Sequence, residues 1–285
     1  MIYYILAILI VCIILILWRK QRDGFTDSSK PIVSVIIPNY NNQTYIKDTI
    51  DSVLNQTYKH YEIIIIDDKS TDNSASIIQN IAKKYPNKIK FIQNKRNLGT
   101  YKSLNKGLKY MTGDYFTILG SDDTFHKDRL LEDVTMLTNT DKLATISKYT
   151  RVNHLNKLIS SPAYGESMLT CHKSVIQKIG PWLNCRFGAD TEYLNRLELL
   201  LNKNSIAYNN KVLYYAIHKQ NNENLTKIYK KDKRKIIVIY FKKLHNYYNT
   251  RINKTQYQEL LNMIPYININ KKDHLTNLKI LKIKY

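Results

Sequence analysis

The stretch YFTILGSDD at residues 115–123 joins an apolar run to a glycine turn and two adjacent carboxylates. Residues 115–119 are aromatic, β-branched or aliphatic, which is typical of a buried strand. Asp122 and Asp123 therefore follow the carboxyl end of a strand, where open α/β sheets bind ligands. Because adjacent carboxylates repel each other, the pair favours a site for a divalent cation that carries a phosphorylated ligand. The alternative is that an aspartate caps a helix expected at 128–137.

Strand and helix patterns alternate before this stretch. The run IIIIDD at 63–68 ends on a second aspartate pair, and its lack of polar alternation is typical of a parallel strand covered on both faces. Further strands are predicted at 32–37, where Pro38 ends the strand, and at 89–92, with apolar residues at helical spacing between them. The alternation predicts an α/β fold with a mostly parallel, right-handed sheet. Both aspartate pairs would then face one cleft.

The second half of the chain gives weaker patterns. From Ser160 onward the apolar spacing is irregular, as expected of a segment that completes a binding site. Asp190 and Glu192 open a predicted helix with leucines on its inner side. Beyond Lys227 we expect helices in a strongly basic region.

The N-terminus has the composition of a membrane segment. Residues 2–18 carry no charge, and three basic residues follow within 19–22. A cleaved signal peptide has its basic segment before the apolar core, so this order favours an uncleaved single-pass anchor at 1–22, followed by a linker at 23–30. The basic flank favours a cytoplasmic globular domain.

The formal net charge of +21 raises the question of a nucleic-acid partner. No DNA- or RNA-binding signature accompanies the charge, and codons rich in A and T also favour lysine, so no nucleic-acid partner is expected. The three cysteines have no metal-site spacing and imply no disulfide framework.

Several segments resemble, in order and spacing, the family 2 glycosyltransferases, which are inverting enzymes with the GT-A fold. They are VSVIIPNYNN at 33–42, SVLNQTY at 52–58, EIIIIDDKSTDNS at 62–74, NLGTYKSLNKGL at 97–108, GDYFTILGSDD at 113–123 and FGADTEYLNRL at 187–197. The resemblance covers residues 31–225 and leaves 226–285 as a basic, predicted helical extension. It implies transfer of a hexosyl or N-acetylhexosaminyl group from a nucleotide-sugar donor, in the first instance a UDP-sugar, to a hydroxyl on a glycan, protein or lipid.

The resemblance assigns donor-binding roles in the first half of the chain. Pro38 and Tyr40 correspond to the loop that lies against the base and ribose. Asp68 corresponds to the carboxylate that accepts the imide N–H of the base, although an Asx turn before Ser70 is an alternative role. Lys102 is a candidate phosphate contact or an ordinary residue on a helix face.

Asp122 and Asp123 resemble the end of the D-x-D element, which implies Mn²⁺ or Mg²⁺ held by carboxylates and diphosphate. Gly120 stands where the first Asp is usual, so we expect weak metal affinity without nucleotide. Asp123 is the expected direct ligand, and Asp122 is assigned to donor binding. His218 resembles a late histidine that reaches the metal or the diphosphate.

Asp190 occupies the position of the catalytic base, which inversion requires on the acceptor side. Glu192 is the alternative base if the helix begins later, and a helix cap is the alternative role for Asp190. Arg196 is assigned to phosphate contact or packing. For Trp182 and Tyr164 we expect core packing, with sugar stacking as the alternative.

Two other functions stay open at this point. A sugar-nucleotide-binding protein without catalysis is supported by Gly120. A basic, membrane-tethered nucleic-acid-binding protein is supported only by the net charge, and it predicts strongly salt-dependent binding to DNA or RNA.

Overall fold

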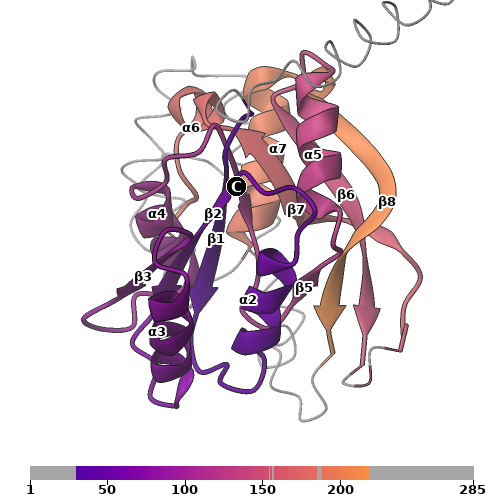
Figure 1. Ribbon diagram of the computed structural model, residues 1–285. Coiled ribbons are helices and arrows are strands. Elements are labelled where there is room, and N and C mark those ends of the chain that lie inside the picture. Colours follow the sequence, from indigo (N-terminus) through magenta and orange to yellow (C-terminus); the bar gives the residue numbers. More distant parts are fainter. Residues whose placement is uncertain (1–29, 154, 156, 185–187, 219–285) are drawn as a thin grey trace, which may run out of the picture.

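The computed structural model describes residues 30–153, 155, 157–184 and 188–218 (Figure 1). The predicted anchor at 1–22, most of the linker and the extension at 226–285 lie outside these residues. Among the described residues, no helix has the length and apolar character needed to cross a membrane.

The elements alternate along the first half of the chain and become more irregular in the second. They are β1 (Val33–Asn39), α2 (Ile46–Leu54), β2 (Tyr61–Asp67), α3 (Ser74–Lys84), β3 (Ile89–Gln93), α4 (Thr100–Leu108), β4 (Tyr115–Ile118), β5 (Thr124–Phe125), α5 (Arg129–Thr138), β6 (Ala144–Val152), β7 (Ala163–His172), α6 (Ser174–Ile179), α7 (Ala189–Leu201), a 3₁₀ turn (Lys203–Ser205) and β8 (Ile206–Ile217).

The strands form one sheet in the order β3-β2-β1-β4-β7-β6-β8-β5. Strands β1 to β4 are mutually parallel, as predicted, and β7 is antiparallel to both β4 and β6. β8 runs parallel to β6, whereas β5 runs antiparallel to β8 (Figure 1). The chain adds β2 and β3 on one side of β1 and then β4 on the other. The carboxyl ends of β1 and β4 therefore form the switch point where open α/β sheets bind ligands.

The prediction that Pro38 ends the first strand is wrong, because β1 continues through Pro38 to Asn39. The N–H of Leu119 donates to the carbonyl of Ile36, so even-numbered β1 residues direct their backbone groups toward β4. Pairing with β4 stops at Ile36 and Ile118. The N–H that proline lacks would thus point beyond the paired region, and its loss leaves the ladder intact.

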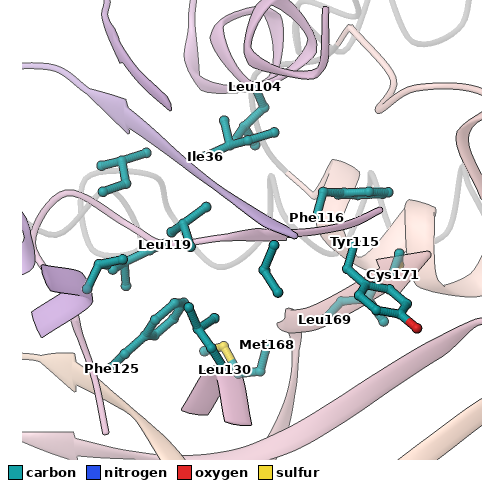
Figure 2. Packing of buried hydrophobic residues seen from close by; sticks show 14 of the residues in the cluster. Ile36, Leu104, Tyr115, Phe116, Leu119, Phe125, Leu130, Met168, Leu169 and Cys171 are labelled. Atoms are coloured by element: carbon teal, nitrogen blue, oxygen red, sulfur yellow. The ribbon is translucent and has the colours of Figure 1, made fainter. Parts of the chain in front are cut away.

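Helix α4 lies unusually close to β1. A Cβ on Gly107 would sit only 2.4 Å from Cγ2 of Ile36, so the approach requires glycine. Figure 2 shows Leu104 of α4 against Ile36, with Leu119 and Phe125 on the other side of the strand. All four of these side chains are buried. This packing fixes α4 and hence its first turn, which lies at the carboxyl edge of the sheet.

Candidate functional site

Asp67, the last residue of β2, organises the turn that follows it. Its carboxylate is buried and accepts from the side chain of Asn39 at 2.8 Å, from the N–H of Ser70 at 3.1 Å and from Gln93 at 2.9 Å. Asp67 therefore holds the turn through the N–H three residues further on, and because the Ser70 N–H is taken by Asp67, the Asx-turn alternative for Asp68 is wrong.

Asp68 holds the segment that leads into α4. One carboxylate oxygen accepts from the N–H of Leu98 at 2.7 Å and from Asn94 at 2.9 Å, and the other accepts from the N–H of Gly99 at 2.7 Å. Each carboxylate oxygen has two lone pairs, so Oδ2 keeps capacity for one more donor beyond these bonds. Asp68 thus has the chemistry to accept a ligand N–H while fixing the start of α4.

The loop after β1 joins the loops after β2 and β4. The side chain of Asn42 donates to Ser121 at 2.6 Å, and its backbone N–H donates to the hydroxyl of Ser74 at 3.0 Å. Pro38 precedes this loop as part of β1, and the Tyr40 side chain within it is 46% exposed. The structure therefore presents the Tyr40 ring to solvent at the switch point.

The Asp123 carboxylate is held by two groups on β8, a strand near the other end of the sheet. The hydroxyl of Tyr214, on β8, donates to Oδ2 at 2.7 Å, and the N–H of Ile217 donates to Oδ1 at 2.9 Å. The Asp123 carbonyl accepts from Thr49 at 2.8 Å. The helix that follows begins at Arg129 with Asp128 in the capping position, so the helix-cap alternative for the aspartate pair is wrong.

Burial and the neighbouring charge of Asp122 raise the pKa of Asp123 to about 7, against the opposing effects of Tyr214, the Ile217 N–H and Arg151. A cation beside the pair would remove this repulsion, and carboxylate oxygens suit Mn²⁺ or Mg²⁺. Within the described part of the chain, no group of three or more His, Cys, Asp and Glu side chains is arranged to hold a metal. The donors present fit a cation that takes its other ligands from a diphosphate and water.

His218 follows the residue whose N–H binds Asp123. Its own N–H donates to the carbonyl of Val152 at 2.8 Å, which fixes the end of β8 beside β6. The structure therefore brings the backbone of His218 to the end of β8 that holds Asp123, and the role of His218 as a metal ligand stays a prediction.

Asp190 lies in the first turn of α7, where its Oδ1 accepts from the hydroxyl of Tyr101 at 3.0 Å. The capping position is taken by Gly188, in a left-handed conformation, so the cap alternative for Asp190 is wrong. Tyr101 is two residues past Gly99, whose N–H binds Asp68. Asp190 is thus fixed to the same edge of the sheet as the two aspartate pairs.

Glu192 and Arg196 form a buried ion pair at 3.0 Å within α7. Arg196 also donates to the carbonyls of Ile179 at 2.6 Å and Pro181 at 2.8 Å. Because the helix begins at Ala189 and the Glu192 side chain is fully buried, the alternative assignment of Glu192 as base is corrected to a packing role. Arg196 likewise packs the helix instead of binding phosphate.

Residues 34–181 match the family described as Glycosyl transferase family 2. The chain belongs to this family. It is 44% identical over 101 residues to the putative teichuronic acid biosynthesis glycosyltransferase TuaG of Bacillus subtilis, covering 35% of this chain and 40% of TuaG. It is 40% identical over 122 residues to an uncharacterized glycosyltransferase of Haemophilus influenzae, covering 43% of this chain and 38% of that protein. These matches span less than half the length of either relative.

Solved structures share the fold. TarS of S. aureus, residues 1–349 in complex with UDP-GlcNAc, aligns over 88% of this chain and 76% of its own, with a TM-score of 0.62 and 21% identity. The mannosyltransferase PcManGT from Pyrobaculum calidifontis, in complex with GDP-Man and Mn²⁺, aligns over 94% of this chain and 81% of its own, with a TM-score of 0.53 and 15% identity. The predicted α/β GT-A type fold is confirmed.

Three further residues that the sequence singled out lie in different surroundings: one on a helix, one in the core and one on the surface. Lys102 lies on the first turn of α4, beside Tyr101. Trp182 is buried and stacks on Tyr193 with 4.7 Å between the ring centroids, so the prediction of core packing is confirmed for Trp182. Tyr164 is 40% exposed and donates to Asn210 at 2.6 Å, so core packing is wrong for this residue.

No sequence pattern singles out Tyr101 or Tyr214, although the hydroxyl of each donates a hydrogen bond to a candidate aspartate. The chain contains 23 tyrosines, and no local spacing distinguishes these two. Their roles depend on contacts that only the fold creates.

Proposed function

We propose that this chain is a metal-dependent, inverting glycosyltransferase that moves a hexosyl or N-acetylhexosaminyl group from a UDP-sugar to an acceptor hydroxyl. The observation that carries the proposal is the position of Asp190. Its hydrogen bond to Tyr101 supports a position at the sheet edge where one aspartate pair lies at the end of β2 and the other follows β4. A binding protein without catalysis has no need of a carboxylate there.

The donor side of the proposal rests on the loops after β1 and β2. Tyr40 offers an exposed ring for the base or ribose, and Asp68 offers a lone pair to the imide N–H of uracil. Pro38 shapes the start of this loop, and Lys102 supplies positive charge one residue after Tyr101. The UDP-GlcNAc and GDP-Man complexes of the structural neighbours support a nucleotide-sugar donor.

The metal side rests on Asp123 and His218 as ligands, with Asp122 assigned to donor binding beside them. A bound Mn²⁺ or Mg²⁺ would neutralise charge on the departing diphosphate. Asp123 is held ready for such an ion by Tyr214 and the N–H of Ile217. The Mn²⁺ in the PcManGT complex supports a divalent metal in this proposal.

Asp190 is assigned the proton transfer. The acceptor oxygen forms a bond to the anomeric carbon as the bond from that carbon to the diphosphate oxygen breaks on the opposite face. The hydroxyl proton passes to the Asp190 carboxylate, and the configuration at the anomeric carbon inverts. Tyr101 keeps the carboxylate facing the edge of the sheet through its hydrogen bond at 3.0 Å.

The cellular setting is part of the proposal. The uncharged segment at 2–18 and the basic residues that follow support a single-pass membrane protein with its catalytic domain on the cytoplasmic side. A membrane-bound enzyme of this kind would meet acceptors carried on lipids or growing glycans.

The test is sugar release and transfer by the full-length protein from a panel of UDP-, GDP- and TDP-sugars, with and without Mn²⁺. We expect turnover of a UDP-sugar that EDTA abolishes. Binding of a nucleotide sugar without turnover across varied acceptors would favour the non-catalytic alternative, and failure to bind any donor would refute the proposal.

A further inference from the structure

Gly120 leaves no room for a side chain. A Cβ added there would lie 2.8 Å from Oδ2 of Asp123 and 3.3 Å from Oδ1 of Asp122. The first distance is shorter than any normal contact, and the nearest atom belongs to a carboxylate that is itself held in place. The Asp123 carboxylate therefore fills the space that a residue with a side chain would need at this position.

Tyr214 bridges the two positions. Its hydroxyl accepts the N–H of Gly120 at 3.2 Å and donates to Oδ2 of Asp123 at 2.7 Å. Its ring is buried and lies against Phe125 with 5.6 Å between ring centroids, so the core fixes where the hydroxyl lies. Together with the N–H of Ile217 on Oδ1, the hydroxyl sets the rotation of the carboxylate.

We propose that Tyr214 is a positioning residue for the metal ligand Asp123, and that Gly120 is required by this arrangement and does not mark a lost ligand. The inference rests on the proposed function, because the metal belongs to it. The two hydrogen bonds use one lone pair on each Asp123 oxygen and fix the carboxylate, whose remaining lone pairs would hold a cation. Such outer hydrogen bonds orient the carboxylates that ligate metals.

The first test compares Tyr214→Phe with Tyr61→Phe in the full-length chain. Tyr61 is also buried, and its hydroxyl donates to the carbonyl of Leu54 at 3.0 Å, but it begins β2 and so lies at the opposite edge of the sheet. Mn²⁺ is titrated in the presence of UDP, with the free ion followed by electron paramagnetic resonance. Tyr214→Phe should weaken Mn²⁺ binding about tenfold, the loss typical of a missing outer-shell hydrogen bond, and Tyr61→Phe should not.

UDP binding in EDTA separates positioning from general damage to the fold. It should be unchanged in both tyrosine variants, because the two hydroxyls bond Gly120, Asp123 and Leu54, whereas the base and ribose are assigned to Tyr40 and Asp68. Mn²⁺ affinity in Tyr214→Phe equal to that of the wild type, or an equal loss in Tyr61→Phe, would overturn the inference. If the wild type binds no Mn²⁺ with UDP or GDP, the metal part of the proposed function fails, and the inference fails with it.

A second test restores the residue that the related D-x-D element carries. Gly120→Asp adds a carboxylate, and a lost ligand regained in this way should tighten Mn²⁺ binding. Our inference predicts the opposite: Gly120→Asp and the smaller change Gly120→Ala both weaken it, because either Cβ displaces the Asp123 carboxylate. Tighter Mn²⁺ binding by Gly120→Asp would overturn the inference.

Discussion

The two halves of the sheet hold their carboxylates in different ways. Asp68, at the end of β2, is held by backbone N–H groups only 30 and 31 residues further along the chain. Asp123, in the turn between β4 and β5, is held by Tyr214 and Ile217, which lie 91 and 94 residues away on β8. The donor side is thus built within the parallel half, whereas the metal side depends on the second half of the chain. Changes in the second half should therefore alter metal use and catalysis more than nucleotide binding.

The largest expected effect on stability comes from removing the Asp68 carboxylate, which holds the start of α4 on the donor side. Asp68→Ala leaves the partly buried N–H groups of Leu98 and Gly99 without their acceptor, which should cost about 3 kcal/mol of unfolding free energy. Urea unfolding measures this loss, and calorimetry should show that UDP no longer binds. A variant that binds UDP like the wild type would contradict the assignment of Asp68.

The next effect concerns the packing that positions α4. Gly107→Ala places a methyl group 2.4 Å from Cγ2 of Ile36 and should destabilise the fold by about 2 kcal/mol through overpacking. The control is Lys109→Ala, an exposed change just past the same helix, which should stay within about 0.5 kcal/mol of the wild type. Equal stability of the two variants in urea would show that α4 does not lie as close to β1 as described.

The substitution Tyr101→Phe separates an effect on catalysis through Asp190 from an effect on donor binding. Losing one hydrogen bond to a charged group costs about 1.5 kcal/mol, so kcat should fall about tenfold as Asp190 loses its orientation. The KM for the donor should change little, because Tyr101 bonds the carboxylate on the acceptor side. A rise in KM at constant kcat would place Tyr101 in donor binding instead.

The smallest effect is a dependence of stability on pH. Burial and Asp122 raise the pKa of Asp123 to about 7 from an ordinary value of 3.8, so the folded state binds more protons between these pH values. This contribution to stability is complete below about pH 4 and is lost as the pH rises through 7. Because the side chain is partly exposed, we expect it to amount to only about 1 kcal/mol.

The measurement is urea unfolding in EDTA at pH 5 and pH 8, for the wild type and for Asp123→Asn. The variant cannot titrate at this position, so its stability should fall less between the two pH values than that of the wild type. Parallel changes in the two proteins would show that Asp123 is ionised throughout.

The parallel half was predictable because its signals are local. Uninterrupted runs such as residues 63–66 are fully buried in β2, and the glycine and aspartates that follow β4 mark the turn at its end. The carboxylates of the site could also be identified from the sequence, because their order along the chain resembles that of a known family. Asp122, Asp123 and Asp190 needed no long-range contact to be found.

The strands in the second half of the chain were not predictable, because buried and exposed residues do not alternate regularly along them. The pairing of β6 with β8 shifts register on both sides of Lys148, where β8 contributes extra residues, so the alternation of inward and outward side chains along β8 is interrupted. The 12-residue β8 accordingly mixes buried and exposed positions without regular alternation. Tyr214 lies in this strand, and its role follows from a contact across 91 residues that no local pattern contains.

The most direct test of the account compares sugar transfer by the wild type and Asp190→Asn, both full-length, with the donor and metal found in the substrate panel. We expect kcat to fall by about a thousandfold in the variant, within the usual range for loss of a general base, while UDP affinity stays the same. Asparagine keeps the acceptor for Tyr101, so the geometry should persist. Transfer at the wild-type rate by Asp190→Asn would contradict the assignment of the base and the mechanism built on it.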